Sequence, residues 1–298
     1  MSRLFGAYVI VDWNAASKPA VGGDSIWIGV MKRDVRFRLA FESFNPATRA
    51  EAEARLNLIL DDLKKRGEKV LLGFDFPLGF PRGLAAGLKL QGEPWSAVWD
   101  QLDKMVKDKA DNTNNRFAVG SEINRRTTGG PFPFWGCPPR DTLTTLQPKR
   151  TKEHGEGDIP EFRHAELAVK PPAVPVWKLY YNGSVGGQAI LGIPFARRLK
   201  KARGDAMKVW PFETGWKALA PADLEGVEVL AAEVYPSLYK AVPLAGEVKD
   251  QALVRTAAEH FARLDEAGKL GAAFAAPKTA DEAVTGDVER EEGWILGV

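Results

Sequence analysis

The chain contains 298 residues, of which 45% are hydrophobic and 27% are charged. These fractions are ordinary for a globular protein and exclude global disorder. The single cysteine, Cys137, excludes an intrachain disulfide, and one cysteine with three histidines is too few for a usual zinc finger. The formal net charge of +2 excludes a polybasic nucleic-acid-binding protein, so phosphate contacts would have to come from local patches.

No apolar run reaches the roughly 20 residues that a membrane helix needs. The apolar run near the start of the chain is short and ends at Asp12, so a β-strand is predicted there rather than a signal peptide. We therefore expect a cytoplasmic protein with no membrane partner.

The first third of the chain predicts a three-stranded antiparallel meander followed by a helix and a fourth strand. The meander strands are expected at residues 7–12, 25–32 and 35–44. Asn45 and Pro46 predict the start of a helix, which ends near Gly67, and the strand at 69–76 follows. Because a helix joins it to the meander, this fourth strand is expected to run parallel to one of the first three.

The rest of the chain alternates helices and strands around one long irregular segment. The expected elements are a helix at 95–108, a strand at 176–182, a helix at 185–203, a strand at 207–214, a strand within 227–239 and a helix ending at Gly268. Residues 109–175 show no period, and a loop this long is usually a lid or an insertion. We predict one α/β domain over residues 1–298, with an insertion or lid at 109–205.

Four acids stand where such a fold builds its sites. Asp12, Asp75 and Glu233 end apolar runs, and Asp250 opens the last core helix. Ligands bind outside the carboxyl ends of parallel strands, and oxygen ligands suit Mg²⁺ or Mn²⁺. These residue types suit metal-assisted phosphoryl chemistry. The competing interpretation is that acids end strands because strands end at the surface. Asp24, Asp34 and Glu42 also flank the meander strands, and we expect them to be surface charges only.

Four motifs resemble those of a known family. They are VDWNAAS at 11–17, GFDFPLGFP at 73–81, AAEVYPSLY at 231–239 and EEGWILGV at 291–298. Together they are similar to a family of uncharacterised proteins predicted to be nucleases of the ribonuclease H-like superfamily, some of which carry cofactor-biosynthesis names. The resemblance spans both ends of the chain and leaves about 110–205 poorly covered.

The resemblance implies a ribonuclease H-like mixed sheet, with three antiparallel strands followed by parallel strands and flanked by helices. It implies two Mg²⁺ ions among four acids, which match Asp12, Asp75, Glu233 and Asp250 in this sequence. Asp281 competes with Asp250 for the fourth place. Unlike well-studied nucleases of the superfamily, this chain has Trp13 after the first acid and lacks a strongly basic face.

Candidate substrate-binding residues lie after the first acid and in the predicted insertion. They are Trp13, Ser17, Arg116, Arg125 and Arg126. Arginine suits phosphate recognition through its planar guanidinium, whereas packing for Trp13 and a solvated helix face for the arginines are the alternatives.

Three functions remain open from the sequence. The first is a divalent-metal-dependent phosphodiester hydrolase, for which a nuclease is the favoured case and nucleic acid or a phosphorylated small molecule the expected partner. The second is a nucleotide-dependent phosphotransferase of the actin and sugar-kinase class, although the loop after Asp12 lacks the glycine of that phosphate loop. The third is a non-catalytic module that binds a ligand or partner.

Overall fold

The structure is a computed structural model that describes residues 3–298, which form an α/β fold around one six-stranded mixed sheet. The strands lie in the order β3-β2-β1-β4-β6-β5. Their bounds are β1 Ala7–Asp12, β2 Trp27–Arg33, β3 Leu39–Phe44, β4 Val70–Phe74, β5 Met207–Val209 and β6 Val229–Glu233.

The first three strands pair antiparallel, and β4, β6 and β5 continue the sheet in parallel from β1. This confirms the predicted meander and the predicted parallel fourth strand. As a result, the carboxyl ends of β1, β4 and β6 lie along one edge of the sheet. The start of β2 lies at the same edge, because Asp12 pairs with Trp27.

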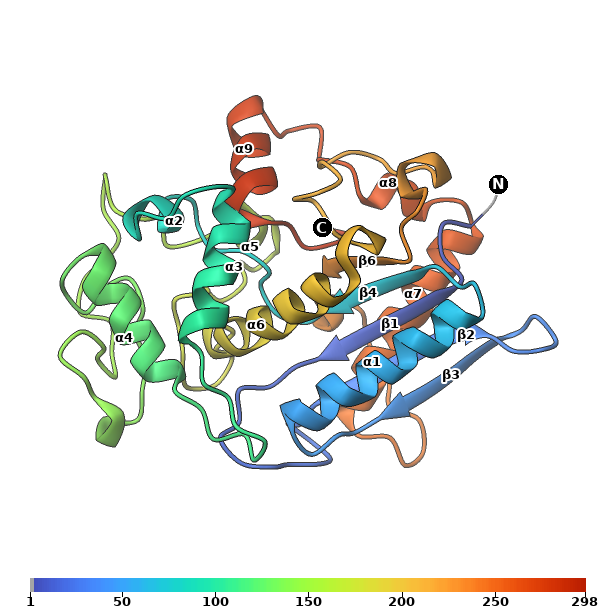
Figure 1. Ribbon diagram of the computed structural model, residues 1–298, viewed down its shortest axis with the longest axis horizontal. Coiled ribbons are helices and arrows are strands. Elements are labelled where there is room, and N and C mark those ends of the chain that lie inside the picture. The colour runs from blue at the N-terminus through green and yellow to red at the C-terminus, as the bar shows by residue number, and fades with distance from the viewer. Residues whose placement is uncertain (1–2) are drawn as a thin grey trace.

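Helices cover both faces of the sheet. Their bounds are α1 Arg49–Lys65, α2 Leu84–Gly87, α3 Pro94–Met105, α4 Arg116–Thr127, α5 His164–Ala168, α6 Gly186–Arg203, α7 Lys249–Glu266, α8 Leu270–Ala273 and α9 Glu282–Asp287. In Figure 1, α1 and α6 lie on the near face of the sheet and α7 on the far face, while α2, α3 and α4 stand to one side.

Alternation along the strands creates two cores. On β1, Val9 and Val11 face the core that contains Leu56 of α1, whereas Ile10 faces the core that contains Phe261 of α7. The same period of two places Asp12 on the α7 side of the sheet. Alternation therefore sets the direction in which each acid at a strand end projects.

The region between α3 and α6 is more ordered than its sequence indicates. It contains α4 and α5 and contributes buried residues to the core. The strand predicted at 176–182 is wrong: this segment makes one isolated bridge, Trp135 to Lys178. Trp177 and Leu179 are buried because the insertion folds over them, and not because a neighbouring strand pairs with the segment.

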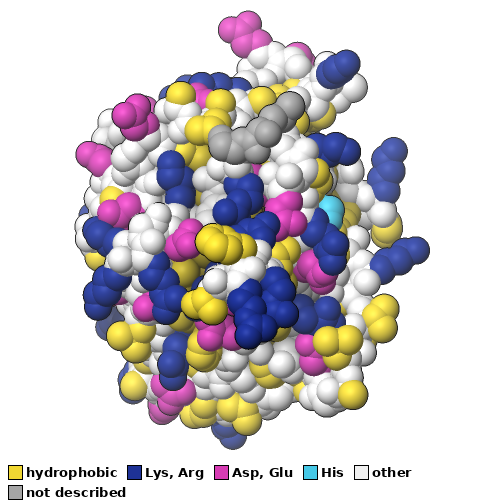
Figure 2. All heavy atoms as spheres, turned by 90° about the vertical axis from the view of Figure 1, so that its right-hand side faces the viewer, with side chains coloured by type: hydrophobic (Ala, Val, Ile, Leu, Met, Phe, Trp, Pro, Cys, Tyr) yellow, Lys and Arg dark blue, Asp and Glu magenta, His cyan; other side chains and the backbone are white. Residues whose placement is uncertain are grey.

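The strand predicted at 207–214 extends only over Met207–Val209. Pro211 follows two residues later, and its lack of an N–H stops the ladder. Across residues 3–298, no helix combines the length and the apolar character that crossing a membrane requires. Figure 2 shows basic and acidic side chains interspersed over one face, in keeping with the net charge of +2.

Candidate functional site

Asp12 and Asp75 occupy neighbouring positions at the ends of two parallel strands. Val11 on β1 pairs with Phe74 on β4, and the Asp75 N–H donates to the Val11 carbonyl oxygen at 2.9 Å. Neighbouring strands lie about 4.8 Å apart. Because Asp12 and Asp75 each come one residue after this pair, both carboxylates project to the α7 side of the sheet.

Asp250 reaches the same edge from α7, where it lies in the first turn of the helix. Its Oδ2 accepts a hydrogen bond from the Asp24 N–H at 2.6 Å. Asp24 is exposed, as expected. It nevertheless lies close to the other acids, because it precedes β2, and β2 begins opposite Asp12. We call Asp12, Asp24, Asp75 and Asp250 the acid rim.

Burial and mutual repulsion disfavour the charged state of two carboxylates in the acid rim, Asp12 and Asp75. Burial raises the pKa of Asp12 well above its usual range, and the nearby carboxylates of Asp75, Asp250 and Asp24 raise it further. Burial, followed by the charges of Glu233 and Asp250, raises the pKa of Asp75 to about 7. Asp12 and Asp75 nevertheless keep some accessible surface. A cation arriving from solvent would relieve the repulsion between these groups.

Glu233 is held differently from the other predicted acids. It pairs with Phe74 across β6 and β4, so its side chain projects to the α6 side of the sheet. Its two carboxylate oxygens accept hydrogen bonds from Nη1 and Nη2 of Arg163, each at 2.7 Å, and Oε2 also accepts from the Leu78 N–H at 3.1 Å. Both oxygens are therefore committed within the protein.

Arg163, the partner of Glu233, was not predicted from the sequence. It is 1% exposed and also bonds Glu166 Oε1 at 3.0 Å and the carbonyl oxygen of Glu292 at 2.9 Å. Burial opposes its charge, but Glu233 and Glu166 outweigh burial and raise the pKa of Arg163. No periodic pattern surrounds Arg163 in the irregular segment, so no local signal singles it out.

A small cavity of about 70 Å³ lies between the acid rim and this ion pair. Asp75, Arg163, Glu233 and Tyr235 are among the residues that line it. The volume suits a few water molecules, and the polar lining offers them hydrogen-bond partners.

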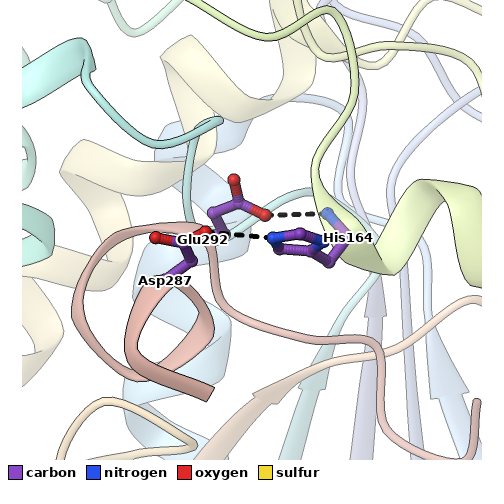
Figure 3. A group of neighbouring side chains, drawn as sticks. All are labelled: His164, Asp287 and Glu292. Atoms are coloured by element: carbon purple, nitrogen blue, oxygen red, sulfur yellow. Dashed lines mark hydrogen bonds and ion pairs between the residues drawn. The ribbon is translucent and has the colours of Figure 1, made fainter. Parts of the chain in front are cut away.

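A second acidic group involves α5 and the C-terminal segment. Figure 3 shows His164, Asp287 and Glu292, whose ligand atoms lie within 4.8 Å of one another. The His164 ring bonds Asp287 Oδ2 through Nε2 at 3.0 Å, and Glu292 Oε2 accepts from the His164 N–H at 2.7 Å. Glu292 Oε1 accepts from the Arg82 N–H at 2.9 Å. These bonds tie the C-terminal segment to the insertion.

Within residues 3–298, no three of the four predicted acids meet this same 4.8 Å criterion. The acid rim is thus a looser group of side chains than His164, Asp287 and Glu292. Its donor set of carboxylate oxygens still fits a hard divalent cation. Asp281 is accounted for elsewhere, since it caps α9 by accepting from the Val284 N–H at 2.9 Å.

The five predicted substrate-binding residues separate into two groups. Trp13 is 1% exposed and stacks on Phe195 with ring centroids 5.0 Å apart, so it belongs to the core. Arg125 forms an exposed ion pair with Glu122 at 2.6 Å. Ser17 and Arg116 bond each other at 3.0 Å and line a groove that also reaches Asp24.

Arg126 donates from Nη2 to the Leu88 carbonyl oxygen at 3.1 Å and lies outside that groove.

Comparison of the chain with protein-family models, with curated proteins and with solved structures gives no match.

Proposed function

We propose that the protein is a divalent-metal-dependent hydrolase of phosphodiesters, a nuclease of ribonuclease H-like architecture. One observation carries this proposal: Asp12 and Asp75 sit side by side at the ends of parallel strands, next to Asp250, with their pKa values raised by burial and by mutual repulsion. Perturbed carboxylates gathered in this way are typical of functional sites.

In this proposal, Asp12, Asp75 and Asp250 hold Mg²⁺ or Mn²⁺. A bound ion of this kind would lower the pKa of a water molecule and stabilise the leaving oxygen. Lys249, which favours the charged form of Asp12, limits the repulsion in the free protein. Glu233 acts as a positioning residue, because its committed oxygens hold Arg163 beside the cavity next to Asp75.

The arrangement of the sheet supports the proposal. A meander of three antiparallel strands followed by parallel strands is the order that the resemblance implies. The first acid ends β1 and the second follows β4. The proposal departs from the sequence-based prediction in one respect, since it moves Glu233 from the metal-holding set to a positioning role.

Metal titration tests the proposal directly. We expect millimolar Mn²⁺ or Mg²⁺ to raise the thermal unfolding temperature, and we expect Asp12→Asn and Asp75→Asn each to abolish this shift. Asp34→Asn is the matched control, because Asp34 lies in an exposed meander turn. Hydrolysis of a labelled oligonucleotide should need the ion and be lost in both rim variants. A wild-type protein that responds to neither ion would instead support the non-catalytic module.

A further inference from the structure

A groove of about 740 Å³ opens beside the acid rim. Its walls come from the loop after β1, the start of α4, residues 179–182 and the start of α6. Asp24, whose N–H bonds Asp250, lies on its border, so the groove is continuous with the rim. The charged side chains of its lining are Lys18, Arg116, Arg140, Asp24 and Asp141, three basic and two acidic.

Arg116 is a buried cation of the groove wall that forms no ion pair, although Asp141 in the same wall favours its charged form. It is 6% exposed, and its Nη1 bonds only neutral oxygens, Ser17 Oγ at 3.0 Å and Asn114 Oδ1 at 2.9 Å. Among residues 3–298, its Nε is buried with no hydrogen-bond partner, and no carboxylate lies within 4.0 Å of the guanidinium. The neighbouring Arg49 has a partner of its own, Asp108 at 2.5 Å.

An unpaired buried charge is costly for a folded protein. Burial and the charge of Arg49 together lower the pKa of Arg116 to about 10, so the group stays protonated at neutral pH. The fold therefore keeps a desolvated guanidinium at the wall of an open groove. An anion from outside the chain would satisfy it.

The start of α6 lies beside the Arg116 side chain. This 18-residue helix has no side-chain cap. The Gly186 N–H donates to the Lys178 carbonyl oxygen at 3.0 Å, whereas among residues 3–298 the N–H groups of Gly187 and Gln188 have no acceptor. Gly187, in that turn, is packed so closely that an added Cβ would lie 3.3 Å from Arg116 Cδ and 2.9 Å from the Leu179 carbonyl oxygen. The first turn of α6 therefore lies beside the Arg116 side chain, and a helix N-terminus and a guanidinium are each groups that bind phosphate.

A row of aromatic rings leads away from Arg116 along the groove. The guanidinium lies 4.3 Å from the centroid of Phe117, which is 6.0 Å from Tyr180, which in turn is 4.8 Å from Tyr181. The two tyrosines are 37% and 46% exposed. Tyr181 also has a φ of 77°, a conformation that non-glycine residues rarely adopt and that tends to occur at functional sites.

We infer that this groove binds a nucleotide, with the phosphate on Arg116 and the α6 N-terminus and the base against the row of Phe117, Tyr180 and Tyr181. The chemistry is shared by a free nucleotide and by one unit of a single strand, on which exposed rings stack without sequence preference. The inference rests on the proposed function and names the substrate class of the neighbouring acid rim.

Binding can be tested without catalysis. We would measure the fluorescence anisotropy of a labelled thymidylate hexamer in EDTA, with wild type, Arg116→Gln and Arg116→Lys. We expect Arg116→Gln to weaken binding at least tenfold and to reduce the salt slope by about 0.7, the value for one phosphate contact on a single strand. Arg116→Lys should lose less, and Arg263→Gln, an exposed arginine on α7, should bind like wild type.

If Arg116→Gln does not fold, as judged by the absence of a cooperative unfolding transition, Tyr180→Ala provides a second variant. Tyr180→Ala should weaken binding about fivefold or more. Thymidine monophosphate that competes with the hexamer indicates a free nucleotide as the ligand, whereas competition by oligonucleotides alone indicates a strand. An abasic hexamer should bind more weakly than the thymidylate hexamer.

The outcomes separate this inference from the proposed hydrolase. Arg116-dependent binding without metal-dependent hydrolysis would support the groove and remove the hydrolase. Hydrolysis with an unchanged KM and affinity in both Arg116→Gln and Tyr180→Ala would keep the hydrolase and overturn the groove. Failure of wild type to bind any of these probes would also overturn it.

Discussion

Asp75 shows how a buried carboxylate in the acid rim opposes the stability of the fold. Its pKa is raised to about 7, so a charged Asp75 at neutral pH weakens the fold. Proteins commonly accept this kind of loss where a site needs a strained or desolvated group. The same reasoning applies to Asp12, whose pKa is also raised by burial.

Asp75→Asn should therefore stabilise the metal-free protein. We expect the variant to gain about 1–4 kcal/mol in the free energy of unfolding at pH 7.5 in EDTA, because it removes a repelled charge. Chemical denaturation of both proteins measures the difference. Asp34→Asn should bring no gain, and a clear loss of stability in Asp75→Asn would contradict the proposed repulsion.

Glu166 gives the molecule a pH dependence away from the acid rim. Burial raises its pKa to about 7, although Arg163 lowers it. The folded state thus holds a proton that the unfolded state releases near pH 4.5, and stability should fall as the pH rises from about 4.5 to about 7.

The contribution of Glu166 to this fall is up to about 3 kcal/mol. We expect Glu166→Gln to flatten the decrease in the unfolding temperature between pH 5 and pH 8, measured by circular dichroism in EDTA. An equally steep decrease in the variant would show that other groups control the pH dependence.

Among the secondary-structure elements, helix α6 connects the groove to the acid rim. Its first turn borders the groove, and its middle packs on Phe76, which follows Asp75. The contact is close because Gly192 has no side chain: an added Cβ would lie 2.5–2.8 Å from ring atoms of Phe76.

Gly192→Ala should force α6 away from Phe76 and lower stability by about 1–3 kcal/mol, the usual cost of overpacking. Gly286→Ala is the matched control, since no atom lies within 4 Å of its added Cβ and it lies in α9. The control should be neutral or stabilise by up to about 1 kcal/mol. Equal unfolding temperatures for the two variants would contradict this packing.

Arg163 joins three distant parts of the chain at the scale of the whole molecule. From the insertion, where it also pairs with Glu166, it links to the end of β6 through Glu233 and to the C-terminal segment through the carbonyl oxygen of Glu292. That segment then docks on the sheet, where the Leu296 N–H donates to the Glu233 carbonyl oxygen at 2.9 Å. This buried cation thus helps to position the insertion beside the acid rim.

Arg163→Gln should destabilise the protein by about 3–5 kcal/mol, because it leaves the buried carboxylate of Glu233 without its counter-charge. Arg125→Gln breaks an exposed pair and should cost at most about 1 kcal/mol. Urea denaturation compares the two variants. A loss in Arg163→Gln as small as that in Arg125→Gln would rule out this central role.

Features that depend on local pattern could be predicted from the sequence. The alternation in the meander, the apolar runs that end at Asp12 and Asp75, and the helix that ends near Gly268 follow from the spacing of hydrophobic residues a few positions apart. Because β1 and β4 are buried parallel neighbours, their terminal acids fall together once the topology is known. Asp250 follows in the same way, as α7 packs on β1 and β2.

The tertiary structure alone decided which groups meet across the chain. Register and side-chain alternation sent Glu233 to Arg163 and away from Asp12, and the start of β2 brought Asp24 to Asp250. The groove around Arg116 is assembled from four separate segments, and no local period records their approach. Hydrophobic spacing therefore determined the elements of this protein, whereas the charges of its site were paired or left unpaired by contacts that exist only in the folded chain.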